Sequence, residues 1–136
     1  MRNLARSLIA AERRNSDSAD TNARAAFRVC GKLRESLSPL TGAVGFRTLL
    51  TRALTLAKAE VPWLADLKVG PGGSLLIPEA LAKEAEGSVA AKGGEALVTQ
   101  VLELLATFIG EALTRRLVQQ IWPKIAFDAP NSGGKT

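Results

Sequence analysis

Residues 95–122 read EALVTQVLELLATFIGEALTRRLVQQIW, and this stretch decides the fold. It contains no proline and a single glycine, Gly110. At about 100° per residue, its apolar residues up to Leu113 cover roughly half of a helical wheel. A stripe this wide predicts a central helix against which several others pack. The predicted core positions are Leu97, Val98, Val101, Leu102, Leu104, Leu105, Phe108, Ile109, Ala112 and Leu113.

The apolar pattern changes face after Leu113, which indicates either a bend near Gly110 or a different contact for the last turns. We expect the later apolar residues to form a second contact, with a partner or with the N-terminal helix of the same chain. Arg115 and Arg116 would lie at the rim of this contact, although Arg115 can also pair with Glu111 one turn earlier. The candidate interaction residues are Leu117, Val118, Ile121, Trp122, Arg115 and Arg116.

Upstream of this stretch, the sequence predicts two further helices of the same domain. Apolar residues recur at helical spacing over residues 22–37, and Ser38-Pro39 is expected to end that helix. A second helix is expected over residues 41–60, before Pro62, and Trp63 and Leu64 should anchor a short helical turn in the core.

The connection to the central helix has a different composition. Two short apolar pieces flank a Gly-Pro-Gly-Gly turn over residues 67–77, which predicts a small β-hairpin. A short polar helix is expected at residues 78–86, and a flexible connection at residues 87–94. The predicted fold is therefore all-α: an antiparallel bundle of about four helices around a long C-terminal helix, with a small β-hairpin insertion.

The termini are expected to lie outside this bundle. Residues 1–22 combine a short amphipathic segment, read as a loosely attached helix or a targeting segment, with a polar linker. Residues 23–123 are expected to form the single helical domain, and residues 124–136 a flexible tail. Residues 129–136, APNSGGKT, fit a relaxed phosphate-loop pattern, but no helix follows to hold a phosphate, so a solvated tail is expected.

Composition excludes several chemistries. The chain has no histidine, which removes His-based general acid–base catalysis and most zinc sites. Its one cysteine, Cys30, lies on an apolar face and is expected to be a buried structural thiol. We therefore expect no enzyme activity, no metal and no cofactor.

The net charge of +5 permits weak attraction to polyanions. A basic stripe on the first long helix, with further basic residues on the next, could contact phosphates, although a solvated face is the more ordinary interpretation. The candidate polyanion-contacting residues are Arg24, Arg28, Lys32, Arg47 and Arg52.

Two pieces, RAAFRVCGKLR at residues 24–34 and TFIGEALTRRLV at residues 107–118, resemble small uncharacterised bacterial helical proteins of similar length. The resemblance runs on through residues 45–60, covers roughly residues 23–123, and implies a bacterial cytoplasmic protein without a nameable activity. The functional prediction is a non-enzymatic helical interaction or regulatory module that self-associates, with no membrane span. The alternative is a weak, sequence-nonspecific nucleic-acid-binding protein, and an NTP-dependent enzyme would require the chain to be a fragment.

Overall fold

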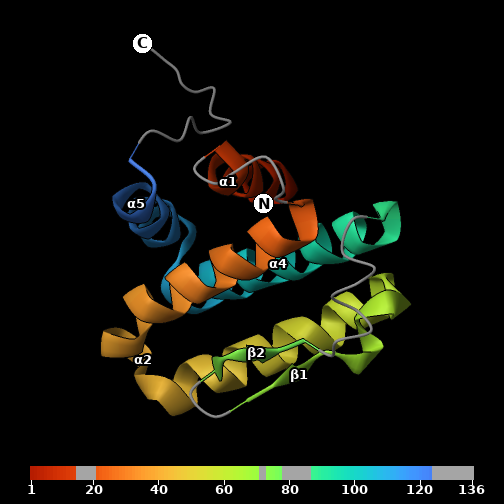
Figure 1. Ribbon diagram of the computed structural model, residues 1–136. Coiled ribbons are helices and arrows are strands. Elements are labelled where there is room, and N and C mark those ends of the chain that lie inside the picture. The colour runs from red at the N-terminus through yellow and green to blue at the C-terminus, as the bar shows by residue number, and fades with distance from the viewer. Residues whose placement is uncertain (15–20, 71–72, 78–86, 124–136) are drawn as a thin grey trace.

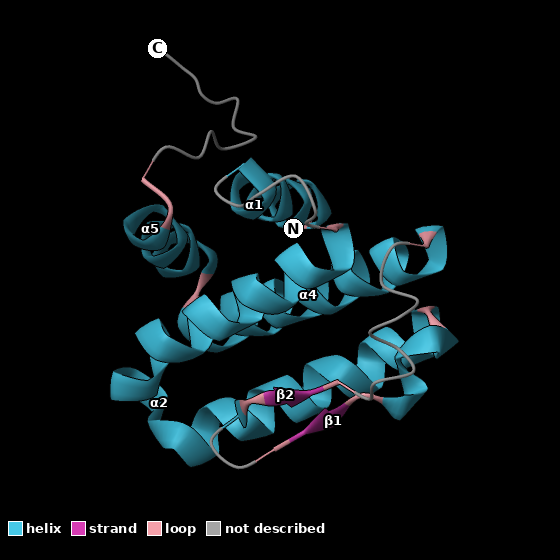
Figure 2. Cartoon of the chain, in the orientation of Figure 1, coloured by secondary structure: helices cyan, strands magenta, loops and turns pink. Residues whose placement is uncertain are grey.

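The computed structural model shows an all-α bundle with one small β-hairpin, and it describes residues 1–14, 21–70, 73–77 and 87–123 (Figure 1). Within these residues, Figure 2 shows that helices make up nearly all of the regular structure. The predicted fold class is confirmed. The elements are α1 (Arg2–Arg14), α2 (Asn22–Glu60), the 3-10 helix η1 (Pro62–Asp66), β1 (Lys68–Val69), β2 (Leu75–Leu76), α4 (Ser88–Ile109) and α5 (Glu111–Ile121).

The helix α2 is a single element with a sharp bend at Gly42. The prediction that Ser38-Pro39 ends a first helix is wrong, because helical hydrogen bonding continues through Pro39. The hydroxyl of Ser38 donates to the carbonyl of Arg34 at 2.7 Å. The break comes three residues after Pro39, where Gly42 adopts φ 75° and ψ 161°, a conformation that glycine tolerates and that other residues rarely adopt.

The two halves of α2 and the helix α4 form the centre of the bundle. A Cβ added to Gly94 would lie 2.7 Å from the Cβ of Ala26, so the start of α4 touches the start of α2. A Cβ added to Gly93 would lie 3.0 Å from the ring of Trp63, which follows the end of α2. The first half of α2 therefore runs in the same direction as α4, and the second half returns antiparallel to it (Figure 1).

The helix α4 begins at Ser88, so the expected flexible connection at residues 87–94 is wrong. Glycine has a low helix propensity, and Gly93 and Gly94 led to that expectation. Both glycines are buried in the helix, where the absence of a side chain lets its backbone approach its neighbours.

The helix α1 belongs to the same core as the rest of the bundle. Its residues Leu4, Ala5, Leu8 and Ile9 are buried and join the main apolar cluster. A loosely attached first helix was the wrong expectation, and the boundary placed before residue 23 does not separate α1 from the domain. The polar linker was expected at residues 15–22, of which residues 15–20 lie outside the described residues.

The hairpin and the short helical turn before it agree with the sequence. The side chain of Leu64 in η1 is fully buried. The strands pair antiparallel, Lys68 with Leu76 and Val69 with Leu75. The predicted helix at residues 78–86 and the tail at 124–136 lie outside the described residues.

A bend near Gly110 was one of the two alternatives for the end of the central helix, and the structure confirms it. Gly110 adopts φ 94° and ψ 150° and separates α4 from α5. The buried face of α4 ends at Leu105. The prediction that Phe108, Ala112 and Leu113 belong to the core is therefore wrong, because Phe108 is exposed in the last turn of α4 and Ala112 and Leu113 are exposed after the bend.

Candidate functional site

The apolar face of α5, expected to contact a second molecule, is covered by the chain itself. Val118 and Trp122 are buried in the main core, and Leu117 and Ile121 are half-buried and pack against it. These residues therefore make the internal contact that the sequence left open as the alternative, and they offer little surface to a partner.

The two arginines of α5 differ in their surroundings. Arg115 is half-buried, and its Nε donates to Oε2 of Glu111 at 3.0 Å, as the i, i+4 spacing predicts. Arg116 is exposed. Neither arginine lies at the rim of a solvent-exposed contact surface formed by Leu117, Val118, Ile121 and Trp122, because the core of the same chain covers these four residues.

A buried carboxylate, Glu12, connects three segments that are far apart in the sequence. Its side chain is only 3% exposed. The indole Nε1 of Trp122 donates to its Oε2 at 2.8 Å, and the Nζ of Lys32 lies 2.5 Å from the same oxygen. The Nε of Arg28 donates to its Oε1 at 3.4 Å. One carboxylate thus holds α1, α2 and the end of α5 together.

This environment keeps Glu12 ionised. Burial by itself raises the pKa of the Glu12 carboxyl, because it disfavours the charged form. The hydrogen bonds from Lys32, Trp122 and Arg28 and the positive charge of Lys32 outweigh burial, so the pKa of Glu12 lies below its ordinary value. A carboxylate with this pKa and three donors is poorly suited to act as a general acid or base near neutral pH.

The same cluster occupies part of the predicted basic stripe. Arg28 and Lys32 both face Glu12, and the Nζ of Lys32 also lies 5.9 Å from the ring centroid of Trp122, within cation–π range. Arg24, Arg47 and Arg52 are exposed. Arg24 lies in the first turn of α2 and Arg47 lies just beyond its bend, so the exposed arginines do not form one compact patch.

A second ionic group attaches the beginning of α1. The Nη2 of Arg2 lies 2.9 Å from Oε2 of Glu60, and its Nη1 lies 3.3 Å from Oε1 of Glu95. The Nε of Arg6 lies 3.0 Å from the same oxygen of Glu95. Hydrogen bonding to Glu60 raises the pKa of Arg2 above its ordinary value. Sequence analysis missed the pairing of Arg2, Arg6 and Glu12, because nothing in a single sequence indicates which distant residues will face each other.

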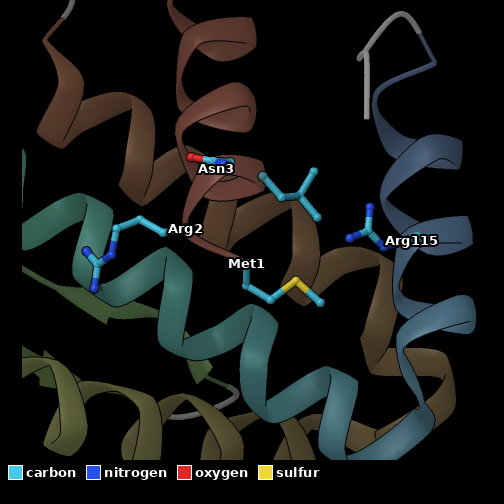
Figure 3. Close-up of a pocket in the computed structure, with 5 residues that line it drawn as sticks. Met1, Arg2, Asn3 and Arg115 are labelled. Carbon is cyan, nitrogen blue, oxygen red and sulfur yellow. The ribbon is translucent and has the colours of Figure 1, made fainter. Parts of the chain in front are cut away.

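A pocket of about 260 Å³ lies between the start of α1 and α5 (Figure 3). Met1, Asn3, Leu4 and the two arginines Arg2 and Arg115 line it. Arg2 reaches from it toward Glu60 and Glu95, and Arg115 is bonded to Glu111. Both arginines of the pocket are therefore engaged by carboxylates of the chain.

The clearest unexplained feature is an exposed apolar surface at the two bends, which we call the apolar end. It consists of two residues around the bend of α2 and two around the bend between α4 and α5. Their exposed fractions range from 46% to 77%. The four residues are Leu40, Val44, Phe108 and Leu113.

Both bends lie at the same end of the bundle. The first half of α2 and α4 start beside each other at Ala26 and Gly94 and run in the same direction. An α-helix rises about 1.5 Å per residue, so Leu40 lies roughly 21 Å along α2 from Ala26. Phe108 likewise lies roughly 21 Å along α4 from Gly94. Figure 1 shows the bend of α2 and the α4–α5 junction together at the left of the view.

Charged residues of opposite sign flank the apolar end. Arg47 is exposed one helical turn after Val44 and has no ion pair in the described part of the chain. Glu111 is the first residue of α5, two residues before Leu113, and its side chain is 65% exposed. The α2 side of the apolar end therefore carries a positive charge, and the α5 side carries both signs, because Glu111 is ion-paired with Arg115 and Arg116 is exposed.

The chain matches no protein-family model, no curated protein and no solved structure. Among the described residues, no helix has both the length and the apolar character needed to cross a membrane.

Proposed function

We propose that this chain is a non-enzymatic helical protein-interaction module that associates with a second copy of itself through the apolar end. The observation that carries the proposal is the exposure of Leu40, Val44, Phe108 and Leu113 at one end of the bundle. Contiguous apolar surface surrounded by polar residues is typical of interaction sites, because covering it removes apolar area from water.

The charges around the apolar end favour a second copy as the occupant. Arg47 is exposed near Val44, and Glu111 and Arg115 form an ion pair on either side of Leu113. A surface that carries both signs can be complementary to itself when a two-fold axis exchanges its two sides.

The chemistry of the chain supports a non-enzymatic role. It has no histidine, its single thiol at Cys30 is buried, and burial raises the pKa of that thiol to about 12. A thiol with this pKa is a poor nucleophile near neutral pH. The resemblance of residues 24–34 and 107–118 to small bacterial proteins supports the cytoplasm of a bacterium as the location.

The strength of association follows from the area available. Burying one large apolar side chain contributes about 1.5–3 kcal/mol, and a two-fold contact buries four on each copy. Association costs on the order of 4–15 kcal/mol in lost freedom of motion, which this burial must exceed.

The substitution Val44→Ser tests the proposal, with Val89→Ser as its matched control. Val89 is 54% exposed, but it lies in the first turn of α4, at the opposite end of the bundle. Each dimer would lose two buried valines, so Val44→Ser should weaken Kd roughly a hundredfold. Light scattering over a concentration series measures this.

Val89→Ser should leave the association unchanged. A wild-type chain that stays monomeric at high concentration would refute self-association, and equal effects of the two substitutions would refute the apolar end as its surface. Circular dichroism checks that both variants keep their helices.

Weak, sequence-nonspecific nucleic-acid binding is the second candidate, and the exposure of Arg24, Arg47 and Arg52 favours it. It has less support, because Arg28 and Lys32 face Glu12. Titration with single-stranded and duplex DNA across a salt series tests it, and no binding even at low salt would end it.

A further inference from the structure

We infer that α5 is the segment that two copies of this chain exchange, with Gly110 as the hinge. In the exchanged pair, α4 and α5 of each copy form one straight helix, and the α5 part packs on the bundle of the other copy. This inference rests on the proposed self-association, and it names the segment through which the two copies join.

Gly110 is suited to be a hinge because it alone separates α4 from α5. The bend depends on its φ of 94° and ψ of 150°, a backbone region that is essentially restricted to glycine. The hydrogen bonds on both sides already follow the helical pattern. The N–H of Gly110 donates to the carbonyl of Ala106, and its carbonyl accepts from the N–H of Thr114, each at 3.0 Å. A change in the dihedral angles of one residue therefore joins the two helices into one.

The start of α5 gains hydrogen bonds in a straight helix. In the bent form, no side chain caps the first turn of α5. When α4 and α5 are continuous, the N–H groups of residues 111–113 bond to the carbonyls of residues 107–109. Straightening thus offsets part of the free energy that is lost when α5 leaves its own bundle.

The apolar stripe of α4 continues through the bend. Leu105 is the last buried residue of α4, and the next apolar residues stand three, four, seven and eight positions after it, which is the spacing of one helical face. The bend interrupts this face and leaves Phe108 71% and Leu113 46% exposed. In the exchanged pair, the two straight helices lie side by side at this point, so each stripe covers the other. The four residues are Phe108, Ile109, Ala112 and Leu113.

Exchange keeps the contacts that α5 makes in a single chain. Val118 and Trp122 are buried in the main core, and the Nε1 of Trp122 donates to Oε2 of Glu12 at 2.8 Å. Glu12 lies on α1, before the hinge, so α5 of a second copy can bring the same indole to the same carboxylate. For this reason, the exchange of an identical element is a low-cost route to a dimer.

The substitution Gly110→Ala tests the hinge. Alanine disfavours the bent conformation and favours a continuous helix, and each dimer contains two hinges. The dimerisation constant should therefore rise roughly a thousandfold over the wild type. Sedimentation velocity over a concentration series measures it. Gly31→Ala is the matched control, because it adds a Cβ inside α2 that meets no atom within 4 Å, and it should leave the association unchanged.

A mixing experiment with Gly110→Ala chains distinguishes exchange from contact between intact monomers. One chain also carries Glu12→Ala, the other carries Trp122→Phe, and the two are refolded together from urea. In an exchanged heterodimer, one site regains both Glu12 and Trp122 and the other lacks both, so no buried indole is left without an acceptor. Heterodimers should therefore rise from the statistical share of about one half to roughly four-fifths or more of all dimers. Native mass spectrometry measures this share.

Glu12→Ala mixed with Lys32→Ala, again in Gly110→Ala chains, is the control for this experiment. Lys32 forms an ion pair with Glu12 from α2, so both residues lie before the hinge and stay in the same bundle. No exchange of α5 can reunite them. The heterodimers of this pair should therefore remain at the statistical share.

The outcomes separate this inference from the proposal on which it rests. A wild type that stays monomeric overturns both. A wild type that associates and is weakened by Val44→Ser, but whose Gly110→Ala variant associates no more strongly, keeps the apolar end as the interface and refutes the exchange. A Gly110→Ala dimer whose heterodimers stay at the statistical share refutes it as well. Loss of helix in Gly110→Ala, seen by circular dichroism, also refutes it, because exchange places the alanine in a helical position.

Discussion

The substitution Glu12→Ala tests how much the buried carboxylate contributes to the stability of the fold. It removes the acceptor of the Trp122 indole, whose Nε1 donates to it at 2.8 Å in a buried position. An unsatisfied buried donor costs about 1–3 kcal/mol. The side chains of Lys32 and Arg28 are roughly 40% exposed and can turn toward water in the variant. The loss of their ion pairs with Glu12 therefore costs less free energy than the unsatisfied indole does. The expected decrease in the free energy of unfolding is about 3 kcal/mol, a large part of the roughly 5–15 kcal/mol of a typical domain.

Urea unfolding followed by circular dichroism measures this decrease, and Glu103→Ala is the matched control. Glu103 is an exposed helical glutamate, so its substitution should change the free energy of unfolding by no more than about 0.5 kcal/mol. The pH dependence gives a second readout. The pKa of Glu12 is lowered in the folded chain, so its stabilisation is present above the ordinary glutamate pKa and is lost as pH falls through the lowered value.

The wild type should therefore lose more stability on acidification than the variant does. A decrease below about 1 kcal/mol, or an equal decrease for Glu103→Ala, would contradict the contribution assigned to the buried donor.

Two further predictions concern the packing of the core. Gly94→Ala should destabilise the chain by about 1–3 kcal/mol, because the new Cβ would lie 2.7 Å from the Cβ of Ala26. Gly31→Ala on α2 meets no atom within 4 Å and should stabilise by about 0.5–1 kcal/mol through helix propensity, so thermal melts of the pair should move in opposite directions. Cys30, buried with a pKa raised to about 12, should react with a thiol reagent at pH 8 only after denaturation. Rapid labelling of the folded chain would show that the thiol is accessible.

Local patterns predicted most of the helices and the hairpin, because these depend on periodicity and turn residues close in sequence. The predicted helix boundaries were wrong where tertiary packing outweighs the intrinsic helix propensity of a residue. Gly93 and Gly94 weaken a helix in isolation, but in the bundle they allow α4 to approach Trp63 and Ala26. Pro39 suggested a stop, but the chain bends at Gly42, where the backbone requires a positive φ.

The candidate site was less predictable. A helical wheel continued past Gly110 placed Ala112 and Leu113 in the core, but the bend turns α5 so that both are exposed while Val118 and Trp122 face inward. A bend near Gly110 was one of two alternatives, and the wheel alone does not show which side chains remain covered after a glycine with φ 94°. The Glu12 cluster gave no signal at all, because its partners in α2 and at the end of α5 become neighbours only in the folded bundle.

The hydrogen bond between Glu12 and Trp122 joins residues that are 110 positions apart. Such a contact closes a loop nearly as long as the chain, so we expect it to form after most of the bundle has assembled. Interactions made after the folding transition state mainly slow unfolding and have little effect on the rate of folding. In stopped-flow experiments, Glu12→Ala should therefore unfold faster and refold at nearly the wild-type rate. The carboxylate would then determine how long each folded molecule lasts, rather than how quickly it forms.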